Sequence, residues 1–136
     1  MCPTERGGDP AVSRTLAAFR AAENSGFDRV VFDFGNGPLP AYVVEQAREF
    51  VGPSGMPTPV QGTAFIGVRF PRAGEMGSYR GPRSVLRPTP SIAEIKIVED
   101  FEGVLVFGIG LDRHNCPRVT VLSSPARLVL DFPWRT

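Results

Sequence analysis

The sequence has few metal-binding residues and little excess charge of either sign. Its 136 residues include one histidine and two cysteines, so a structural zinc site with four cysteine or histidine ligands cannot be assembled. Lys96 is the only lysine, and 15 basic residues against 14 acidic ones leave a net charge of +1. Such a chain lacks the positive field with which proteins attract nucleic acid. We therefore expect no nucleic-acid partner, and no metal or other cofactor.

Long hydrophobic runs are also missing. No segment approaches the roughly 20 apolar residues of a membrane-spanning helix, and the opening MCPTERGGDP is polar, unlike a signal peptide. Cys2 directly after Met1 fits a bacterial lipoprotein that begins at its lipidated cysteine, and an incidental cysteine is the alternative. Cys2 is thus a candidate lipidation site, which would be the chain's only link to a membrane. A disulfide with Cys116 is allowed but not required.

Glycine and proline are abundant, with 15 and 14 residues. Both interrupt long helices and mark turns. Between them lie segments of alternating apolar and polar residues, which predict an all-β, antiparallel β-sandwich with short or no helices. The predicted strands are residues 27–34, 63–70, 92–100, 101–111, 118–124 and 127–132. The predicted core residues are Val30, Phe32, Phe34, Ile95, Ile97, Leu128, Leu130 and Phe132.

Other segments are less regular. Residues 1–13 are predicted to be a disordered leader that precedes a single domain at 14–133. Residues 11–24 fit either a helix or a strand, and residues 41–50 fit an edge-type strand. Gly108 and Gly110 indicate a bulge or close packing within their strand. Residues 71–91 form the longest irregular stretch, and such a loop is usually functional or mobile.

One short internal similarity links two of the predicted strands. Residues 28–34 read DRVVFDF and residues 126–132 read ARLVLDF. Both segments carry the pattern Arg-x-Val-x-Asp on one face and apolar residues on the other. Two similar strands whose outward Arg and Asp side chains pair across or along a sheet would explain this pattern.

Catalytic chemistry has little support in the sequence. His114 and Cys116 could form a base and nucleophile pair, but a loop histidine is the simpler interpretation. Glu99, Asp100 and Glu102 could supply paired carboxylates or calcium ligands, but a charged turn is simpler. The motifs GxSxG and HExxH and a phosphate-binding glycine loop are absent from the sequence. A small hydrolase is therefore only a remote alternative.

The irregular stretch holds the best candidate binding residues. Tyr79 adjoins Arg80, Arg83 and Arg87, and no acidic residue lies between Met76 and Ala93. Guanidinium groups match carboxylates, and an aromatic ring offers a face to a sugar. Tyr42 and Trp134 are further candidates for an exposed aromatic platform. A solvated loop with structural aromatics is the alternative interpretation.

Three motifs together resemble a known family. FDRVVFDF, DFEGVLVFGIGLD and SSPARLVLDF are similar to the AMIN-like domain of actinobacterial envelope proteins, over residues 14–133. This family is related in pattern to the AMIN domain of bacterial amidases and secretins. The resemblance implies a β-sandwich, an export signal that is often of the lipoprotein type, and no catalytic residues. The amidase-linked relatives are thought to hold their partners at the cell wall by binding peptidoglycan.

The resemblance and the residues together predict a non-catalytic binding module of the cell envelope. Its expected ligand is peptidoglycan or another wall polymer. The alternative is a protein–protein interaction module that docks an envelope partner through an edge strand or through the 71–91 loop. Either function would place the protein outside the cytoplasm, in the envelope or the extracellular space.

Overall fold

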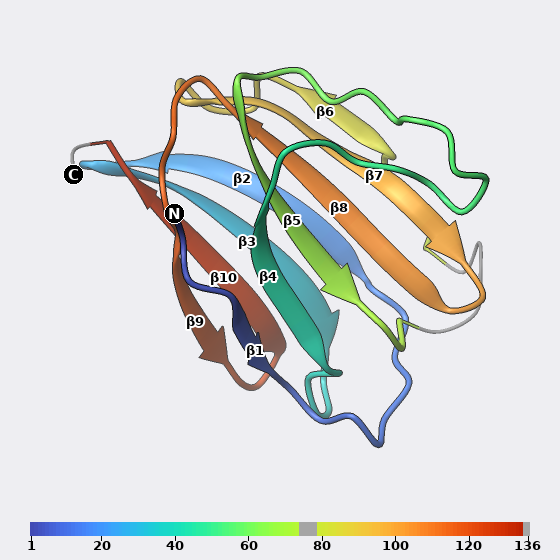
Figure 1. The fold of residues 1–136 in the computed structure, drawn as a ribbon. Coiled ribbons are helices and arrows are strands. Elements are labelled where there is room, and N and C mark those ends of the chain that lie inside the picture. The colour runs from blue at the N-terminus through green and yellow to red at the C-terminus, as the bar shows by residue number, and fades with distance from the viewer. Residues whose placement is uncertain (74–78, 135–136) are drawn as a thin grey trace.

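β-Strands make up the regular structure of the chain (Figure 1). The computed structural model describes residues 1–73 and 79–134. Among these residues there is no helix long and apolar enough to cross a membrane. In chain order the strands are β1 (Glu5–Gly7), β2 (Ala18–Asn24), β3 (Phe27–Gly35), β4 (Tyr42–Ala47), β5 (Ala64–Phe70), β6 (Ser84–Leu86), β7 (Ile92–Phe101), β8 (Val104–Leu111), β9 (Arg118–Leu122) and β10 (Ala126–Pro133).

The strands form two antiparallel sheets that pack face to face, as Figure 1 shows. The six-stranded sheet has the order β1-β4-β5-β8-β7-β6, and the four-stranded sheet has the order β2-β3-β10-β9. Each sheet buries one of its faces against the other sheet, so apolar and polar residues alternate along the strands. The predicted all-β, antiparallel β-sandwich is confirmed.

The core lies between the two sheets. All eight predicted core residues are buried in it. Phe32 of β3 is fully buried, and its ring centroid lies 4.9 Å from that of Phe107 and 5.4 Å from that of Phe70. These partners belong to β8 and β5 of the other sheet. The aromatic cluster therefore joins the sheets at their centre.

Short turns set the register of neighbouring strands. Asn24 pairs with Phe27, which leaves Ser25 and Gly26 as the loop between β2 and β3. Phe101 pairs with Val104 across the β7–β8 turn, whose central residues Glu102 and Gly103 have φ angles of +51° and +83°. Positive φ at both central positions matches the twist of antiparallel strands, and glycine adopts it without steric cost.

The N-terminal segment differs from the prediction of a disordered leader. Residues 5–7 form strand β1, which pairs with β4 in the register Gly7–Tyr42 to Glu5–Val44. This pairing also corrects the prediction for residues 41–50, because β4 lies between β1 and β5 and is not an edge strand. A disulfide between Cys2 and Cys116 holds the segment in place. Three residues are too few to show a strand pattern, so this pairing has no signature in the sequence.

The structure also defines two segments whose sequence pattern is ambiguous or irregular. Residues 18–24 are a strand, which resolves the choice between helix and strand for residues 11–24. The predicted irregular stretch contains the short strand β6, which pairs with β7 at the edge of the six-stranded sheet. Residues 74–78 of that stretch, including Met76, lie outside the described residues.

Candidate functional site

The predicted loop site does not form a shared surface, because its aromatic residue is buried. Tyr79 belongs to the hydrophobic core, where its ring centroid lies 6.2 Å from that of Phe19. Its hydroxyl donates to the carbonyl of Pro82 over 3.1 Å, and burial raises the pKa of this phenol. The phenol therefore anchors the loop to the core and offers no face to a ligand.

The loop arginines are exposed, but two of them are paired with carboxylates from elsewhere. Arg83 lies 3.3 Å from Asp100, and Arg87 binds both carboxylate oxygens of Asp112 at 2.9 Å. The second interaction lowers the pKa of Asp112. Arg80 is exposed. The local excess of positive charge in the sequence is thus largely cancelled by residues that are distant in the chain.

The other two predicted aromatics have different surroundings. Tyr42 is buried against Gly7 of β1, and burial raises its pKa. Trp134 is partly buried at the end of β10, and its indole N–H donates to the carboxylate of Asp28 over 3.0 Å. Trp134 therefore retains some exposed surface, whereas Tyr42 does not act as a platform.

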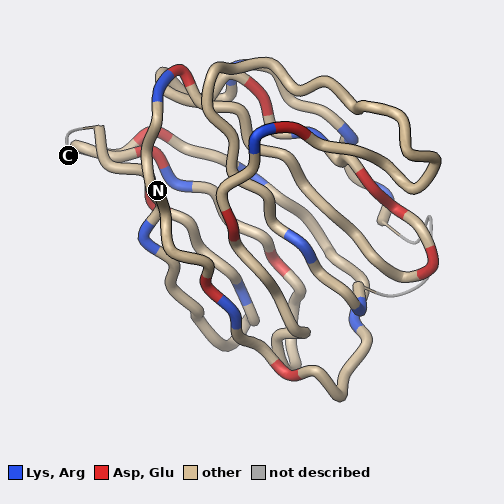
Figure 2. The backbone as a smooth tube through the Cα atoms, in the orientation of Figure 1, with Lys and Arg blue, Asp and Glu red and all other residues tan. Residues whose placement is uncertain are grey.

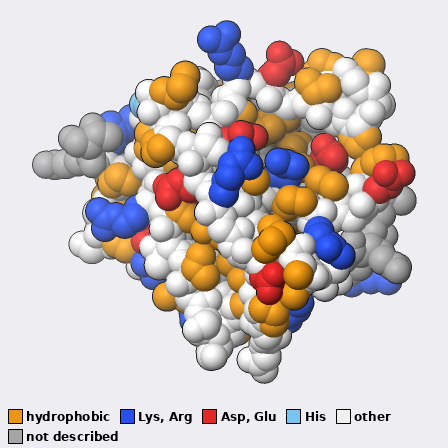
Figure 3. Space-filling view, turned by 60° about the horizontal axis from the view of Figure 1, so that its bottom comes forward, with side chains coloured by type: hydrophobic (Ala, Val, Ile, Leu, Met, Phe, Trp, Pro, Cys, Tyr) orange, Lys and Arg blue, Asp and Glu red, His pale blue; other side chains and the backbone are white. Residues whose placement is uncertain are grey.

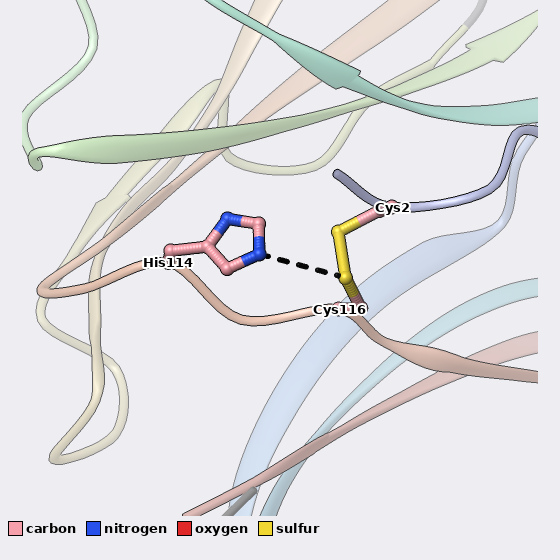
Figure 4. A group of neighbouring side chains, drawn as sticks. All are labelled: Cys2, His114 and Cys116. Carbon is pink, nitrogen blue, oxygen red and sulfur yellow. Dashed lines mark hydrogen bonds between the residues drawn. A yellow bond between two sulfur atoms is a disulfide. The ribbon is translucent and has the colours of Figure 1, made fainter.

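The two cysteines are bonded to each other, and His114 points toward them (Figure 4). Cys116 Sγ lies 3.9 Å from His114 Nε2. The three ligand atoms of Cys2, His114 and Cys116 lie within 4.8 Å of one another. A sulfur in a disulfide is neither a thiolate nucleophile nor a thiolate metal ligand. Because the Cys2 sulfur is bonded to the Cys116 sulfur, it has no free valence for a thioether-linked lipid. In this state the chain has neither the Cys–His pair nor a lipidated Cys2.

The acidic candidates lie at the β7–β8 hairpin. Asp100 near the end of β7 is held by Arg83, and Glu102 occupies the turn. Glu99 lies beside Asp100 on the same strand, so the two side chains point in different directions. These positions agree with a charged turn.

The outer face of the six-stranded sheet is crossed by the connection between β4 and β5 (Figure 1). A Cβ atom on Gly108 would lie 2.8 Å from the ring of Phe50, and the backbone of Gln61 occupies the corresponding space at Gly110. These glycines allow the connection to lie on the sheet, which confirms the close packing predicted for β8. Glu94 accepts a hydrogen bond from the Gln61 N–H at 2.8 Å, and Lys96 donates to the Pro59 carbonyl at 2.9 Å.

The outer face of the four-stranded sheet is different, because it presents arginine side chains to solvent. Strand register places the outward residues in rows across β2, β3, β10 and β9. The rows are Ala18–Asp33–Arg127–Leu122, Arg20–Val31–Val129–Thr120 and Ala22–Arg29–Asp131–Arg118. We call this surface the arginine face, after Arg20, Arg29, Arg118 and Arg127.

The centre of the arginine face is apolar and shielded. Val31 and Val129 point outward, yet only 9% and 2% of their surfaces are exposed. Long arginine side chains can cover apolar neighbours with their methylene stems and keep the guanidinium groups in water. The face therefore combines a shielded, apolar centre with charged groups around it.

Two of the four arginines are paired with aspartates. Arg29 makes two hydrogen bonds to Asp131, at 2.8 and 3.0 Å, and these raise the pKa of the guanidinium. Arg20 lies 3.3 Å from Asp33. Within the described part of the chain, Arg118 and Arg127 form no ion pair. Local positive charge therefore remains on this face. Elsewhere basic and acidic residues are interspersed, along the backbone in Figure 2 and on the face of the molecule seen in Figure 3.

Two hollows adjoin on this face and share Arg29. One, of about 510 Å³, lies between Phe27, Arg29, Arg118 and Asp131. The other, of about 280 Å³, lies between Arg20, Arg29 and Arg127 over the two valines. Arginine side chains thus line both hollows, where an anionic group can be met by planar, two-pronged donors.

The internal similarity of the sequence is the signal that could have located this face. β3 and β10 pair antiparallel, with Val31 opposite Val129, so each Arg-x-Val-x-Asp pattern runs against the other. This pairing sets Arg29 beside Asp131, which confirms the expected contact between outward Arg and Asp side chains. Arg127 stands opposite Asp33, but its Nε donates to the carbonyl of Pro125.

Comparison with known protein families identifies a match for most of the chain. The model of the AMIN-like domain family matches residues 14–133, which is most of the chain. No curated protein and no solved structure matches the chain significantly. The family match spans all the strands from β2 to β10, so it includes both sheets of the sandwich and the arginine face. The chain therefore belongs to the AMIN-like domain family.

Proposed function

We propose that the protein is an exported module that binds peptidoglycan, or another anionic wall polymer, on its arginine face. Domains of this family occur in envelope-associated proteins and are generally non-catalytic binding modules. The observation that carries the proposal is the contrast between the two outer faces. The outer face of the six-stranded sheet is crossed by a connecting segment, and that of the four-stranded sheet presents four arginines around a shielded, apolar centre.

The distribution of charge on the protein indicates a ligand that carries carboxylate groups. Because the net charge is only +1, long-range attraction is weak and local charge must hold an anion. Wall polymers carry carboxylates on their peptides, and the guanidinium fork binds carboxylates with two parallel hydrogen bonds. Arg118 and Arg127 are available for such contacts, because no ion pair holds them within the described residues.

An exported location also agrees with the disulfide. Disulfides persist in oxidising compartments and are rare in a reducing cytosol. The Cys2–Cys116 bond joins positions 114 residues apart, so its formation fixes the whole N-terminal segment. This supports the envelope location that the family suggests.

Co-sedimentation with purified peptidoglycan tests the proposal. The variant Arg118→Ala with Arg127→Ala should sediment much less than the wild type at low salt, because it removes two guanidinium groups that form no ion pair within the described residues. The matched control, Arg80→Ala with Arg83→Ala, changes the net charge equally but leaves the arginine face intact. It should sediment like the wild type. Binding should also weaken as salt rises past about 0.15 M.

Two outcomes would contradict the proposal. If the control loses binding and the arginine-face variant does not, the ligand is held by the loop. If the wild type does not sediment at low salt, the polymer is not the ligand, and the protein-interaction alternative takes precedence. That alternative has one structural feature in its favour: the edge strand β9 leaves Val121 and Leu122 exposed, where an extended segment of an envelope protein could add a strand.

A further inference from the structure

A further pocket, separate from the two hollows of the arginine face, lies at the end of the sandwich beside Trp134. It measures about 420 Å³, a volume within the range of small-ligand sites. Four chain segments meet there: the end of β2, the connection before β7, the connection after β8 and the residue after β10. Its lining residues are Glu23, Pro90, Ser91, Asp112, Arg113 and Trp134. We call it the tryptophan pocket.

The indole of Trp134 is fixed before any ligand arrives. Its N–H donates to Asp28 over 3.0 Å, and its backbone N–H donates to the Gly26 carbonyl over 3.0 Å. Asp28 is fully buried and also accepts hydrogen bonds from Thr89 and Ser91. An indole held in this way loses little conformational freedom on binding. Because its only donor is already used, it has mainly its ring surface to offer.

The charges around the pocket nearly balance. Both carboxylate oxygens of Asp112 are occupied by Arg87. Glu23 and Arg113, which are both exposed, are left with opposite charges. A strongly anionic or cationic ligand would gain little here. A purely apolar ligand would strip water from the charged groups without pairing them, which is unfavourable.

A sugar ring is neither strongly charged nor purely apolar, so it suits this pocket. One face of a pyranose consists of C–H groups that pack on an aromatic ring, and its hydroxyls can pair with carboxylate, guanidinium and hydroxyl groups. Trp134 and Pro90 supply the apolar surface, while Glu23, Ser91 and Arg113 supply the polar groups. We infer that the tryptophan pocket binds a neutral pyranose ring of a glycan.

This inference deepens the proposed function, because it assigns the glycan and the carboxylates of one polymer to two sites. The sites are neighbours in the chain: Pro133 lines a hollow of the arginine face, and Trp134 lines the tryptophan pocket. One polymer that carries both sugars and acidic peptides could therefore occupy both. The inference rests on the proposed function only in taking the wall polymer as the source of the sugar.

The experiment uses the fluorescence of Trp134, which is the only tryptophan in the chain. The wild type is titrated with fully N-acetylated chitotetraose, an uncharged sugar oligomer, at salt well above about 0.15 M, so that exposed ionic contacts are screened. We expect a saturable change in emission. Sorbitol, which has hydroxyl groups but no ring face, should cause none. The rim variant Glu23→Gln with Arg113→Ala keeps the fluorophore and should bind about tenfold more weakly, as expected for lost hydrogen bonds to charged groups.

The arginine-face variant, Arg118→Ala with Arg127→Ala, should bind chitotetraose like the wild type. A wild type without a saturable response, or a rim variant with unchanged affinity, would overturn the saccharide pocket. Co-sedimentation with peptidoglycan would separately show whether the arginine face still holds the polymer. The saccharide pocket is thus tested with the rim variant and the sugar oligomer, whereas the proposed function is tested with the arginine-face variant and peptidoglycan.

Discussion

At the scale of single residues, Asp28 shows how one buried charge organises the end of the sandwich. It lies on β3, opposite Phe132 of β10, and it ties the segment before β7 to Trp134. Burial by itself would raise the pKa of this carboxyl. Hydrogen bonds from Ser91, Thr89 and Trp134 outweigh that effect and lower the pKa below 3.8.

The lowered pKa predicts how stability depends on pH. The contribution of Asp28 is complete above its unfolded value of 3.8 and is lost as pH falls through the lower folded value. Asp28→Asn should cost about 1–3 kcal/mol in the free energy of unfolding at pH 7, because the amide cannot accept all of these hydrogen bonds. Urea unfolding at pH 7 and at about pH 3 measures this, and the difference between variant and wild type should shrink in acid. An equal difference at both pH values would contradict the role of the ionised carboxylate.

Single residues also show what the sequence could and could not predict. The alternation of Val30, Phe32 and Phe34 identified the buried face of β3, because period-two burial is set locally by the pleat. The burial of Tyr79 was not predictable in this way, since it depends on contact with Phe19 of β2, which is distant in the chain. Likewise, the partners of Arg83 and Arg87 lie 17 and 25 residues away.

At the scale of elements, β1 was missed because a three-residue strand has almost no pattern of its own. Its presence changed β4 from an edge strand into an inner one. The arginine face was missed for a related reason. Its four arginines are spread from residue 20 to residue 127, and only the pairing of β3 with β10 and their neighbours brings them together. The repeated Arg-x-Val-x-Asp pattern identified the central pair but not the flanking strands.

The attachment of β1 is also the basis of a stability prediction. The disulfide closes a loop between positions 114 residues apart, and loss of such a bond typically costs 2–5 kcal/mol. Cys2→Ser with Cys116→Ser should therefore lower the free energy of unfolding by about that amount. Chemical denaturation measures the loss, and amide exchange should show faster opening of β1 than of β3.

Reduction of the wild-type protein with a dithiol is the matched control, since it breaks the same bond without changing the sequence. It should reproduce the loss of stability. A change below about 1 kcal/mol in both experiments would mean that the β1–β4 pairing holds the N-terminal segment without the disulfide.

At the scale of the whole molecule, the two sheets differ in how their outer faces are covered. The six-stranded sheet is crossed on its outside by the β4–β5 connection and supports the fold. The four-stranded sheet leaves its outer face exposed, with hollows that share Arg29. The tryptophan pocket lies next to this face at the end of the sandwich. The proposed function places a polymer along this side of the molecule, and membership of the AMIN-like family suggests a wall-associated binding role.

The most direct test of the central claim maps the binding surface residue by residue. Labelled protein is titrated with a soluble peptidoglycan fragment that carries an acidic peptide, and amide chemical shifts are followed by NMR. The account predicts shifts concentrated on the arginine face, at Arg20, Arg29, Arg118 and Arg127 and at the valines between them. Shifts confined to the loop around Arg80 and Arg83, or to the outer face of the six-stranded sheet, would contradict it.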